Sequence, residues 1–279
     1  MGTPSPDNAH VPPQVMNQNT GDNPFSFVVP TEFVEIPSQG KFYGPNHPLH
    51  NQTTIEIKQM TAKEEDILTS RALLKKGIAL DRVISSLIID KNINPNTLLV
   101  GDRNAIIVAA RVSGYGNDYS TTVTCPACSS QVKYSFDLNE AEVYKGDSLQ
   151  ANEATSNEDG TFTTILPRTK IEVTFRLLSG TDEKNLMSQL ESARKRKQEE
   201  NTITRQLKQI ILAVNGDTDQ NNINFVVENM PSSDARHLRA IYKIATPNID
   251  LTQAFECDNC GHEQDMEVPL TADFFWPDR

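Results

Sequence analysis

The four cysteines of this 279-residue chain constrain its fold more than any other feature, because they occur as two widely separated Cys-x-x-Cys pairs. The first pair is Cys125 and Cys128, in CPAC, and the second is Cys257 and Cys260, in CDNC. Four cysteines are far too few for the disulfide framework of a small secreted domain. We therefore interpret the two pairs first as metal-binding motifs.

Short segments with the alternation of β-strands flank each pair. They are 120–124 and 132–138 around the first pair, and 251–256 and a strand ending at Leu270 around the second. A Cys-x-x-Cys turn between two strands directs both thiolates into one small concavity, and two such turns supply four ligands for a tetrahedral site. Four sulfur ligands favour Zn²⁺. We predict one structural zinc ion per chain, and its ligands are Cys125, Cys128, Cys257 and Cys260.

Other uses of the cysteines remain open at the level of sequence. Iron or a cluster is an alternative occupant, and disulfides or free thiols are alternatives to metal. A thioredoxin-like redox motif requires a Cys-x-x-Cys pair at a helix N-terminus, whereas both pairs here are predicted between strands. His262 follows the second pair closely and could replace one ligand, but we expect it near the site or on the surface.

The distances along the chain indicate an internal duplication. Cys125 lies 23 residues after Asp102, and Cys257 lies 23 residues after Asp234. In both intervals a helix start is followed by an apolar helix, a break with Gly or Pro, a strand and the cysteine pair. The order and type of the elements agree as well as the spacing.

The predicted elements that lead up to these intervals, together with the first helix of each interval, also follow one order. In the first half they are the strand 54–60 and the helices 61–75, 80–89 and 103–112. In the second half they are the strand 169–176, a long helix from Thr181 that 202–214 continues or follows, a loop over 219–222, and the helix 234–245. We therefore predict an α+β fold of two similar lobes, each with the order strand, helices, strand, Cys-x-x-Cys turn, strand, joined by a shared zinc-ribbon-like site. The alternative is two unrelated α+β lobes that use the same turn.

Composition divides the chain into four parts. Residues 1–24 are rich in Pro, Asn and Gly, so we expect a tail that is flexible or binds a partner. Residues 25–144 form the first lobe, 145–162 a polar linker or insert, and 163–279 the second lobe with an aromatic C-terminal tail. The aromatic side chains of this tail must dock on their own domain or on another chain. They are Phe274, Phe275 and Trp276.

Charge and hydropathy argue against two classes of partner, nucleic acid and membrane. With a net charge of −11 the chain does not present the broad basic surface of a nucleic-acid-binding protein. No apolar run approaches the roughly 18–20 residues that span a bilayer, and no signal peptide precedes the fold. We expect a soluble protein made in a cytoplasm. The one basic run, 194–197, is expected to form a solvated helix face or to contact an acidic partner.

The chain lacks the common catalytic motifs: there is no phosphate-binding loop, nucleophile elbow, HExxH helix or dinucleotide fingerprint. Ser233, Asp234 and His237 have the residue types of a catalytic triad, but the same residues are also typical of a capped helix start. We expect no enzymatic activity.

Several stretches together resemble the T4-like bacteriophage base plate protein family. The resemblance covers about residues 30–279. It is carried by 34–43 (VEIPSQGKFY), 98–103 (LLVGDR), Arg111 with Tyr115 and Gly116, both cysteine motifs, and 274–277 (FFWP).

The resemblance implies a role in the virion: a structural subunit of the baseplate hub, made in the bacterial host and bound to other tail and baseplate subunits in a large hetero-oligomer. It transfers no catalytic residues. One alternative is a hub assembly chaperone that is absent from the mature virion. Further alternatives are a zinc-ribbon nucleic-acid-binding protein and a metal-dependent or redox enzyme.

Overall fold

The computed structural model describes residues 29–149, 153–268 and 272–275. Within these residues the chain is a mixed α+β protein, as the sequence predicts, with one four-stranded sheet and four two-stranded sheets. The predicted tail 1–24, the predicted strand end at Leu270 and the tryptophan, Trp276, lie outside the described residues. No helix among the described residues is both long and apolar enough to cross a membrane.

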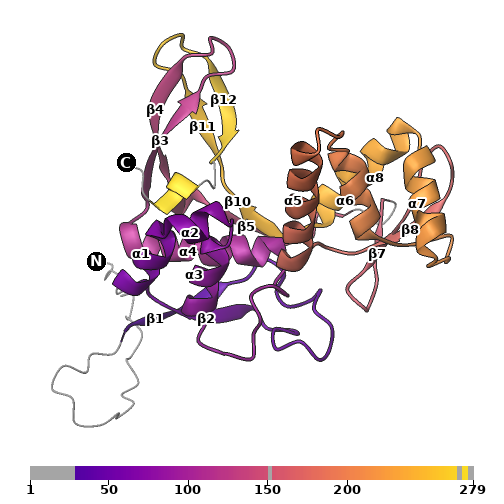
Figure 1. The fold of residues 1–279 in the computed structure, drawn as a ribbon, viewed down its shortest axis with the longest axis horizontal. Coiled ribbons are helices and arrows are strands. Elements are labelled where there is room, and N and C mark those ends of the chain that lie inside the picture. Colours follow the sequence, from indigo (N-terminus) through magenta and orange to yellow (C-terminus); the bar gives the residue numbers. More distant parts are fainter. Residues whose placement is uncertain (1–28, 150–152, 269–271, 276–279) are drawn as a thin grey trace, which may run out of the picture.

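The first half of the chain, residues 29–149, begins with a β-hairpin covered by four helices (Figure 1). These elements are β1 (Thr31–Glu35), β2 (Thr54–Lys58), α1 (Ala62–Thr69), α2 (Arg71–Lys75), α3 (Ala79–Leu87) and α4 (Val100–Tyr115). β1 and β2 pair antiparallel, and the buried side chains of Val34 and Ile55 lie opposite each other. The helix predicted over 61–75 is divided in two, because the extended backbone of Ser70 separates α1 from α2.

The second half of the chain, residues 153–275, contains the four-stranded antiparallel sheet, in the order β6–β7–β8–β9, and four helices. The strands are β6 (Thr155–Ser156), β7 (Phe162–Ile165), β8 (Glu172–Phe175) and β9 (Ile211–Val214). The helices are α5 (Gly180–Lys195), α6 (Thr202–Ile210), α7 (Gln220–Asn229) and α8 (Ser232–Ala245).

Two segments of the second half differ from the sequence prediction. The segment 202–214 is helical only as far as Ile210, because Ile211 and Val214 are buried in β9, which pairs with β8. The segment 219–222, predicted as a loop, contains the start of α7, where the side chain of Asp219 accepts a hydrogen bond from the amide of Asn221. An Asn-rich sequence favours a loop unless such a cap satisfies the first amides of a helix.

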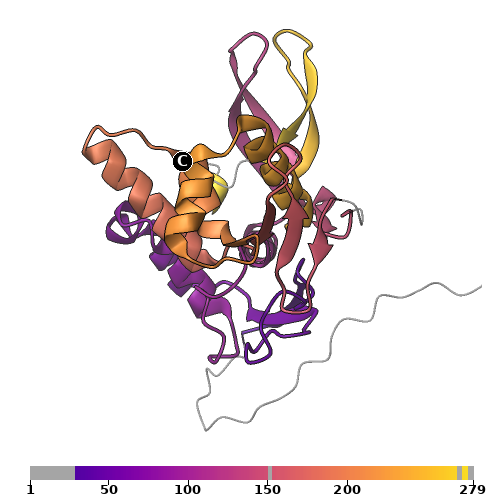
Figure 2. The ribbon, with the colours of Figure 1, turned by 90° about the vertical axis from the view of Figure 1, so that its right-hand side faces the viewer.

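Two long hairpins stand side by side and project from the body of the protein (Figures 1 and 2). They are β3 (Asp118–Thr124) with β4 (Gln131–Asp137), and β11 (Thr252–Glu256) with β12 (Glu263–Glu267), and we call them together the hairpin arm. The hydroxyl of Tyr134 donates to the carbonyl of Ala254 over 2.9 Å. The side chain of Gln253 both donates to and accepts from the backbone of Asp137. The arm therefore joins the two halves of the chain.

Below the arm the two halves also share a small sheet. After β4, a short 3₁₀ turn at Leu138–Glu140 leads to β5 (Glu142–Tyr144), which pairs antiparallel with β10 (Asn248–Asp250). α4 packs against this part of the chain so closely that a Cβ atom at Gly101 would lie 2.0 Å from the carbonyl oxygen of Pro247. Only glycine permits this approach, so the position fixes the distance between α4 and β10.

The C-terminal 3₁₀ turn (Ala272–Phe275) packs on the first half, where Phe274 and Phe275 are fully buried. The guanidinium of Arg111, buried within α4, donates to the carbonyl oxygens of Phe274, Gly116 and Asp118 over 2.8, 2.6 and 2.9 Å. A buried cation is tolerated when all its donors find acceptors. The aromatic side chains that the structure describes therefore dock on their own chain.

Two helices begin with the same carboxylate arrangement. At α1, Glu64 accepts from the amide of Thr61 and pairs with Lys58 over 2.7 Å. At α5, Asp182 accepts from the amide of Ser179 and pairs with Arg176 over 2.6 Å. Each is a capping box strengthened by a cation six residues before the carboxylate.

The two sequence landmarks, Asp102 and Asp234, also have similar surroundings. Each is buried in the first turn of its helix and holds a turn that follows a proline. Asp102 accepts from the amide and the hydroxyl of Ser38, and from the hydroxyl of Tyr43. Asp234 accepts from the amides of Arg168 and Thr169 and from the Thr169 hydroxyl. The helix N-terminus further favours a negative charge at these places.

We predict that Glu64→Gln lowers the free energy of unfolding by about 2 kcal/mol at pH 7, since the carboxylate is fully buried and accepts several hydrogen bonds. Burial alone raises the pKa of Glu64, but hydrogen bonds from Lys58, Ser86 and Thr61 outweigh it and lower the pKa from 4.5 to about 2. A depressed pKa stabilises the fold above the ordinary pKa, and this contribution is lost as the pH falls. The difference between wild type and variant should therefore shrink between pH 5 and pH 2 in urea unfolding.

Asp66→Asn is the matched control for this measurement. Asp66 is an exposed carboxylate on the same helix, so its replacement should change stability by less than about 0.5 kcal/mol at every pH. If a bound metal is lost at low pH, the loss affects the wild type, Glu64→Gln and Asp66→Asn alike, so it does not change the differences between them. A Glu64→Gln effect that is constant with pH would contradict the assigned role of the carboxylate.

Candidate metal centre

The first cysteine turn connects β3 to β4 at the free end of the hairpin arm. Cys125 directly follows β3, and its amide donates to the carbonyl of Ser130 over 2.9 Å. The amide of Ser129 donates back to the carbonyl of Cys125 over 2.9 Å, and Ser129 has a positive φ of 57°. These bonds close a tight turn that directs the sulfurs of Cys125 and Cys128 to one side.

The second cysteine turn, between β11 and β12, repeats these hydrogen bonds. The amide of Cys257 donates to the carbonyl of His262 over 2.9 Å, and the amide of Gly261 donates to the carbonyl of Cys257 over 2.8 Å. Gly261 has a φ of 65°. The residue after the second cysteine thus needs a left-handed backbone in both turns, which glycine adopts freely and serine adopts at some cost.

The two turns face each other and bring the four predicted ligands together. All four sulfur atoms lie within 4.8 Å of one another. The Sγ atoms of Cys125 and Cys260 are 3.8 Å apart, as are those of Cys128 and Cys257. A disulfide requires about 2.05 Å. A tetrahedral Zn²⁺ with bonds of about 2.3 Å places its sulfur ligands about 3.8 Å apart. The sulfurs therefore fit a tetrahedral metal site.

Burial and hydrogen bonding also suit metal ligands. The first cysteine of each pair is buried and the second is exposed. The Ser130 hydroxyl lies 2.8 Å from the Cys128 sulfur, and the Asn259 side-chain amide donates to the same sulfur over 3.7 Å. The hydrogen bonds from Ser130 and then Asn259 lower the pKa of the Cys128 thiol to about 5. At Cys260 a backbone hydrogen bond from His262 lowers the pKa, but the neighbouring cysteine sulfurs and burial outweigh it and raise the pKa to about 12. The thiolate is the form that binds a metal.

Other residues that the sequence singled out do not join this cluster. His262 contacts the side chain of Gln264, and it is not one of the grouped ligands found among the described residues. Asp234 is occupied by the turn at 168–169, so it is not arranged as the acid of a triad with Ser233 and His237. Both cysteine pairs lie between strands, as predicted, rather than at a helix N-terminus.

The donors to the Cys128 sulfur, Ser130 and Asn259, were not predicted from the sequence. Ser130 could have been found, since a hydroxyl two residues after a ligand can reach its sulfur within the same turn. Asn259 could not, because it lies on the other hairpin and meets Cys128 only when the two hairpins are side by side.

Comparison with known protein families gives a match over most of the chain. A family model described as T4 bacteriophage base plate protein matches residues 29–276. No curated protein and no solved structure matches the chain.

We predict that Cys257→Ser and Cys128→Ser both abolish metal binding, although Cys257 is buried and Cys128 is exposed. Losing one of four ligands removes the closed shell, and loss of the metal should lower Tm by about 10 °C. Elemental analysis and thermal unfolding of protein purified without added metal measure both effects.

His262→Ala is the control, because it changes the same turn without removing a sulfur ligand. This variant should keep its metal and its Tm. A Cys128→Ser protein that retains the full metal content would contradict a four-cysteine site.

Proposed function

The chain belongs to the T4 bacteriophage base plate protein family, and on this basis we propose that it is a non-enzymatic structural subunit of the hub region of a contractile-tail baseplate, stabilised by one structural zinc ion. The observation that carries this proposal is the extent of the match, which covers every residue that the structure describes. The match confirms the resemblance that the sequence suggested, and it implies a location in the virion tail.

The closed ligand set supports a structural rather than a catalytic metal. Four cysteines complete the tetrahedral shell of Zn²⁺ and leave no position for a substrate or an activated water. The ion would therefore act as a crosslink between the two hairpins of the arm. Each hairpin is a two-stranded sheet, which is marginally stable by itself, so an ion shared by both would hold the arm in one shape.

Polar side chains that could serve catalysis are used within the fold instead. Asp102 and Asp234 hold turns, Glu64 and Asp182 cap helices, and Arg111 holds the C-terminal turn. This use of buried charge supports a protein whose task is to keep a shape and to bind other subunits.

Several correspondences support two repeated lobes joined by the zinc site. The two cysteine turns share their hydrogen bonds, and Asp102 and Asp234 occupy the same place relative to their helices and to the cysteines. The capping boxes at α1 and α5 share the cation six residues earlier. Two unrelated lobes would not be expected to agree in such local details.

The partners that this role requires are other tail and baseplate subunits in a large hetero-oligomer. The alternative role, a hub assembly chaperone, agrees with the same family membership. A chaperone leaves the particle before the particle is complete. The composition of finished particles distinguishes the two roles.

We predict about one zinc atom per chain in protein purified without added metal. Elemental analysis for zinc and iron measures this directly, and chelation followed by renewed analysis provides the control. A zinc content below about 0.2 per chain would contradict the proposed metal, and stoichiometric iron would replace zinc as its identity.

We predict that the protein is present in mature virions at a fixed ratio to the other baseplate subunits. Quantitative mass spectrometry of particles purified through two successive gradients measures that ratio, and abundant host proteins serve as the control for contamination. Abundance in infected cells together with absence from finished particles would overturn the structural role and identify an assembly factor.

A further inference from the structure

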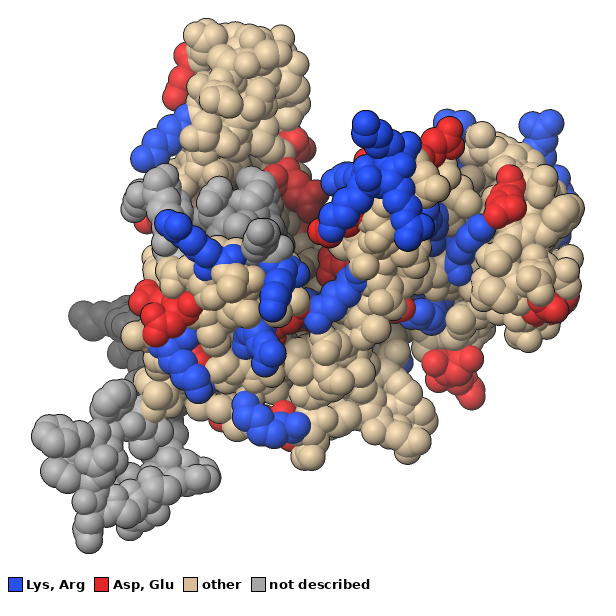
Figure 3. Space-filling model, viewed as in Figure 1, with Lys and Arg blue, Asp and Glu red and all other residues tan. Residues whose placement is uncertain are grey.

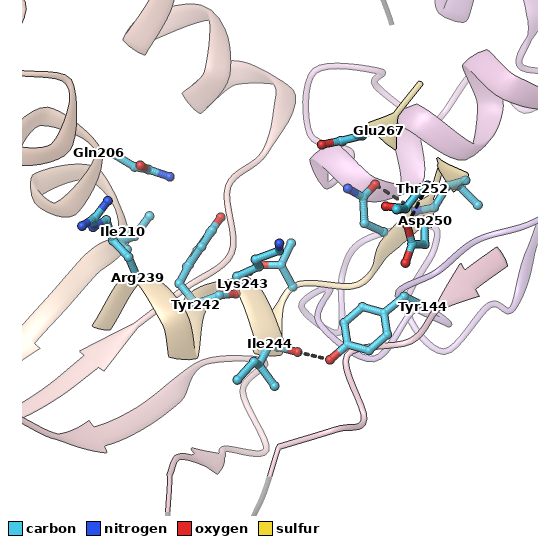
Figure 4. A pocket seen from close by; sticks show the side chains of 13 residues that line it. Tyr144, Gln206, Ile210, Arg239, Tyr242, Lys243, Ile244, Asp250, Thr252 and Glu267 are labelled. Atoms are coloured by element: carbon cyan, nitrogen blue, oxygen red, sulfur yellow. Dashed lines mark hydrogen bonds between the residues drawn. The ribbon is translucent and has the colours of Figure 1, made fainter. Parts of the chain in front are cut away.

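A groove of about 560 Å³ lies where the two halves of the chain meet. One wall is formed by α6 and α8, and the other by β10 and the lower ends of β11 and β12 (Figure 4). The hydroxyl of Tyr144 on β5 donates to the carbonyl of Ile244 on α8 over 2.5 Å. This bond connects the two walls across the floor and holds them at a fixed separation.

The two walls carry opposite charges. Arg239 and Lys243 lie one turn apart on the α8 wall, and Asp250 and Glu267 lie on the strand wall (Figure 4). All four side chains are exposed, and in the described part of the chain none of them forms an ion pair. Arg239 donates only to the Ala235 carbonyl of its own helix. The Asp250 carboxylate accepts a hydrogen bond from the amide of Thr252 over 2.9 Å. The groove therefore offers two cations opposite two anions, with no ion pair between the walls among the described residues.

The floor of the groove is aromatic and aliphatic. Tyr144 and Tyr242 are half-buried, and Ile210 and Ile249 lie beside them. The hydroxyl of Tyr242 accepts the amide hydrogen of Leu178, so it is held by the fold. Tyrosines in such positions are frequent anchors of protein interfaces.

The exposure of the rim decides the size of the occupant. Small-molecule sites enclose most of their ligand, roughly 70–90% of its surface. Here the charged residues of both walls and Thr252 are exposed, so the groove remains open along its length. An open groove with an apolar floor and charged walls fits a length of polypeptide better than an enclosed small molecule.

The spacing of the charges indicates the form of that polypeptide. Arg239 and Lys243, at i and i+4 of a helix, have side chains about 6 Å apart. Alternate residues of an extended strand are separated by about 6.6 Å and point to one side, while the residues between them point to the other side. An extended segment in the groove therefore presents one set of side chains to each wall.

We propose that this groove binds an extended segment of another baseplate subunit, with acidic side chains directed to Arg239 and Lys243 and basic side chains directed to Asp250 and Glu267. The proposal rests on the proposed function, since it names the kind of partner that a baseplate subunit binds. A segment of one charge is repelled by one of the walls, so the alternation of charge gives specificity.

The first test is photo-crosslinking in infected cells. Thr252→p-benzoylphenylalanine places the crosslinker on the exposed rim. The matched control is Phe225→p-benzoylphenylalanine on α7, because Phe225 is 68% exposed and lines no part of the groove. Mass spectrometry should find the Thr252 crosslink in one segment of a different baseplate subunit, with alternating acidic and basic residues. A crosslink only to residues 1–28 of this protein, to a second copy of it, or to no protein would overturn the proposal.

The second test reverses the charge of each wall in the crosslinking protein. Arg239→Glu with Lys243→Glu should reduce the crosslink yield at least tenfold, and Glu267→Lys should also reduce it. The control, Lys63→Glu with Arg71→Glu on α1 and α2, makes the same change in net charge at exposed sites outside the groove and should leave the yield unchanged. An increased yield for Glu267→Lys would show a purely acidic occupant and overturn the alternation.

These outcomes separate the groove from the function. If the protein is present in virions but gives no groove crosslink, the structural role stands and the groove proposal is wrong. If the protein is absent from virions but crosslinks to a baseplate subunit during assembly, the structural role is wrong and the groove proposal stands. Thermal unfolding of each purified variant confirms that a lost crosslink does not result from misfolding.

Discussion

The approach of the four cysteine sulfurs is the interaction on which the rest of the structure depends. Each pair belongs to a hairpin of only two strands, and the sulfurs that come within 3.8 Å of each other belong to different hairpins. Thiolates at this separation repel one another unless a cation lies between them. A metal ion bound by the four sulfurs would remove this repulsion and stabilise the paired arm.

The arm is one of several places where the halves of the chain meet, and each depends on a different kind of contact. Close backbone packing brings Gly101 against Pro247, and strand pairing joins β5 to β10. The buried guanidinium of Arg111 binds the C-terminal turn through Phe274. Because these contacts surround β10, they also determine the position of the strand wall relative to α8. The groove is thus a consequence of how the halves are joined.

Local signals predicted the parts of the fold that depend on neighbouring residues. The cysteine turns, the strands around them and the helices that begin near Asp102 and Asp234 lie close to their predicted positions. The prediction failed at β9, where Ile211–Val214 continues a helical pattern but is buried beside β8. It failed at α7, where an Asn-rich start depends on the cap from Asp219. In both cases a contact outside the local pattern decided the outcome.

The sequence by itself determined the four cysteines as candidate metal ligands, their position between strands, the equal spacing from two aspartates, and the family resemblance. These follow from residue types at short separations, which act through the backbone of a single turn or helix. Only the tertiary structure decided that the two pairs face each other, that Asn259 reaches Cys128, and that opposite charges line one groove. The contacts at the cysteines join residues more than a hundred positions apart, and the packing of the whole chain sets their distances and the separation of the groove walls.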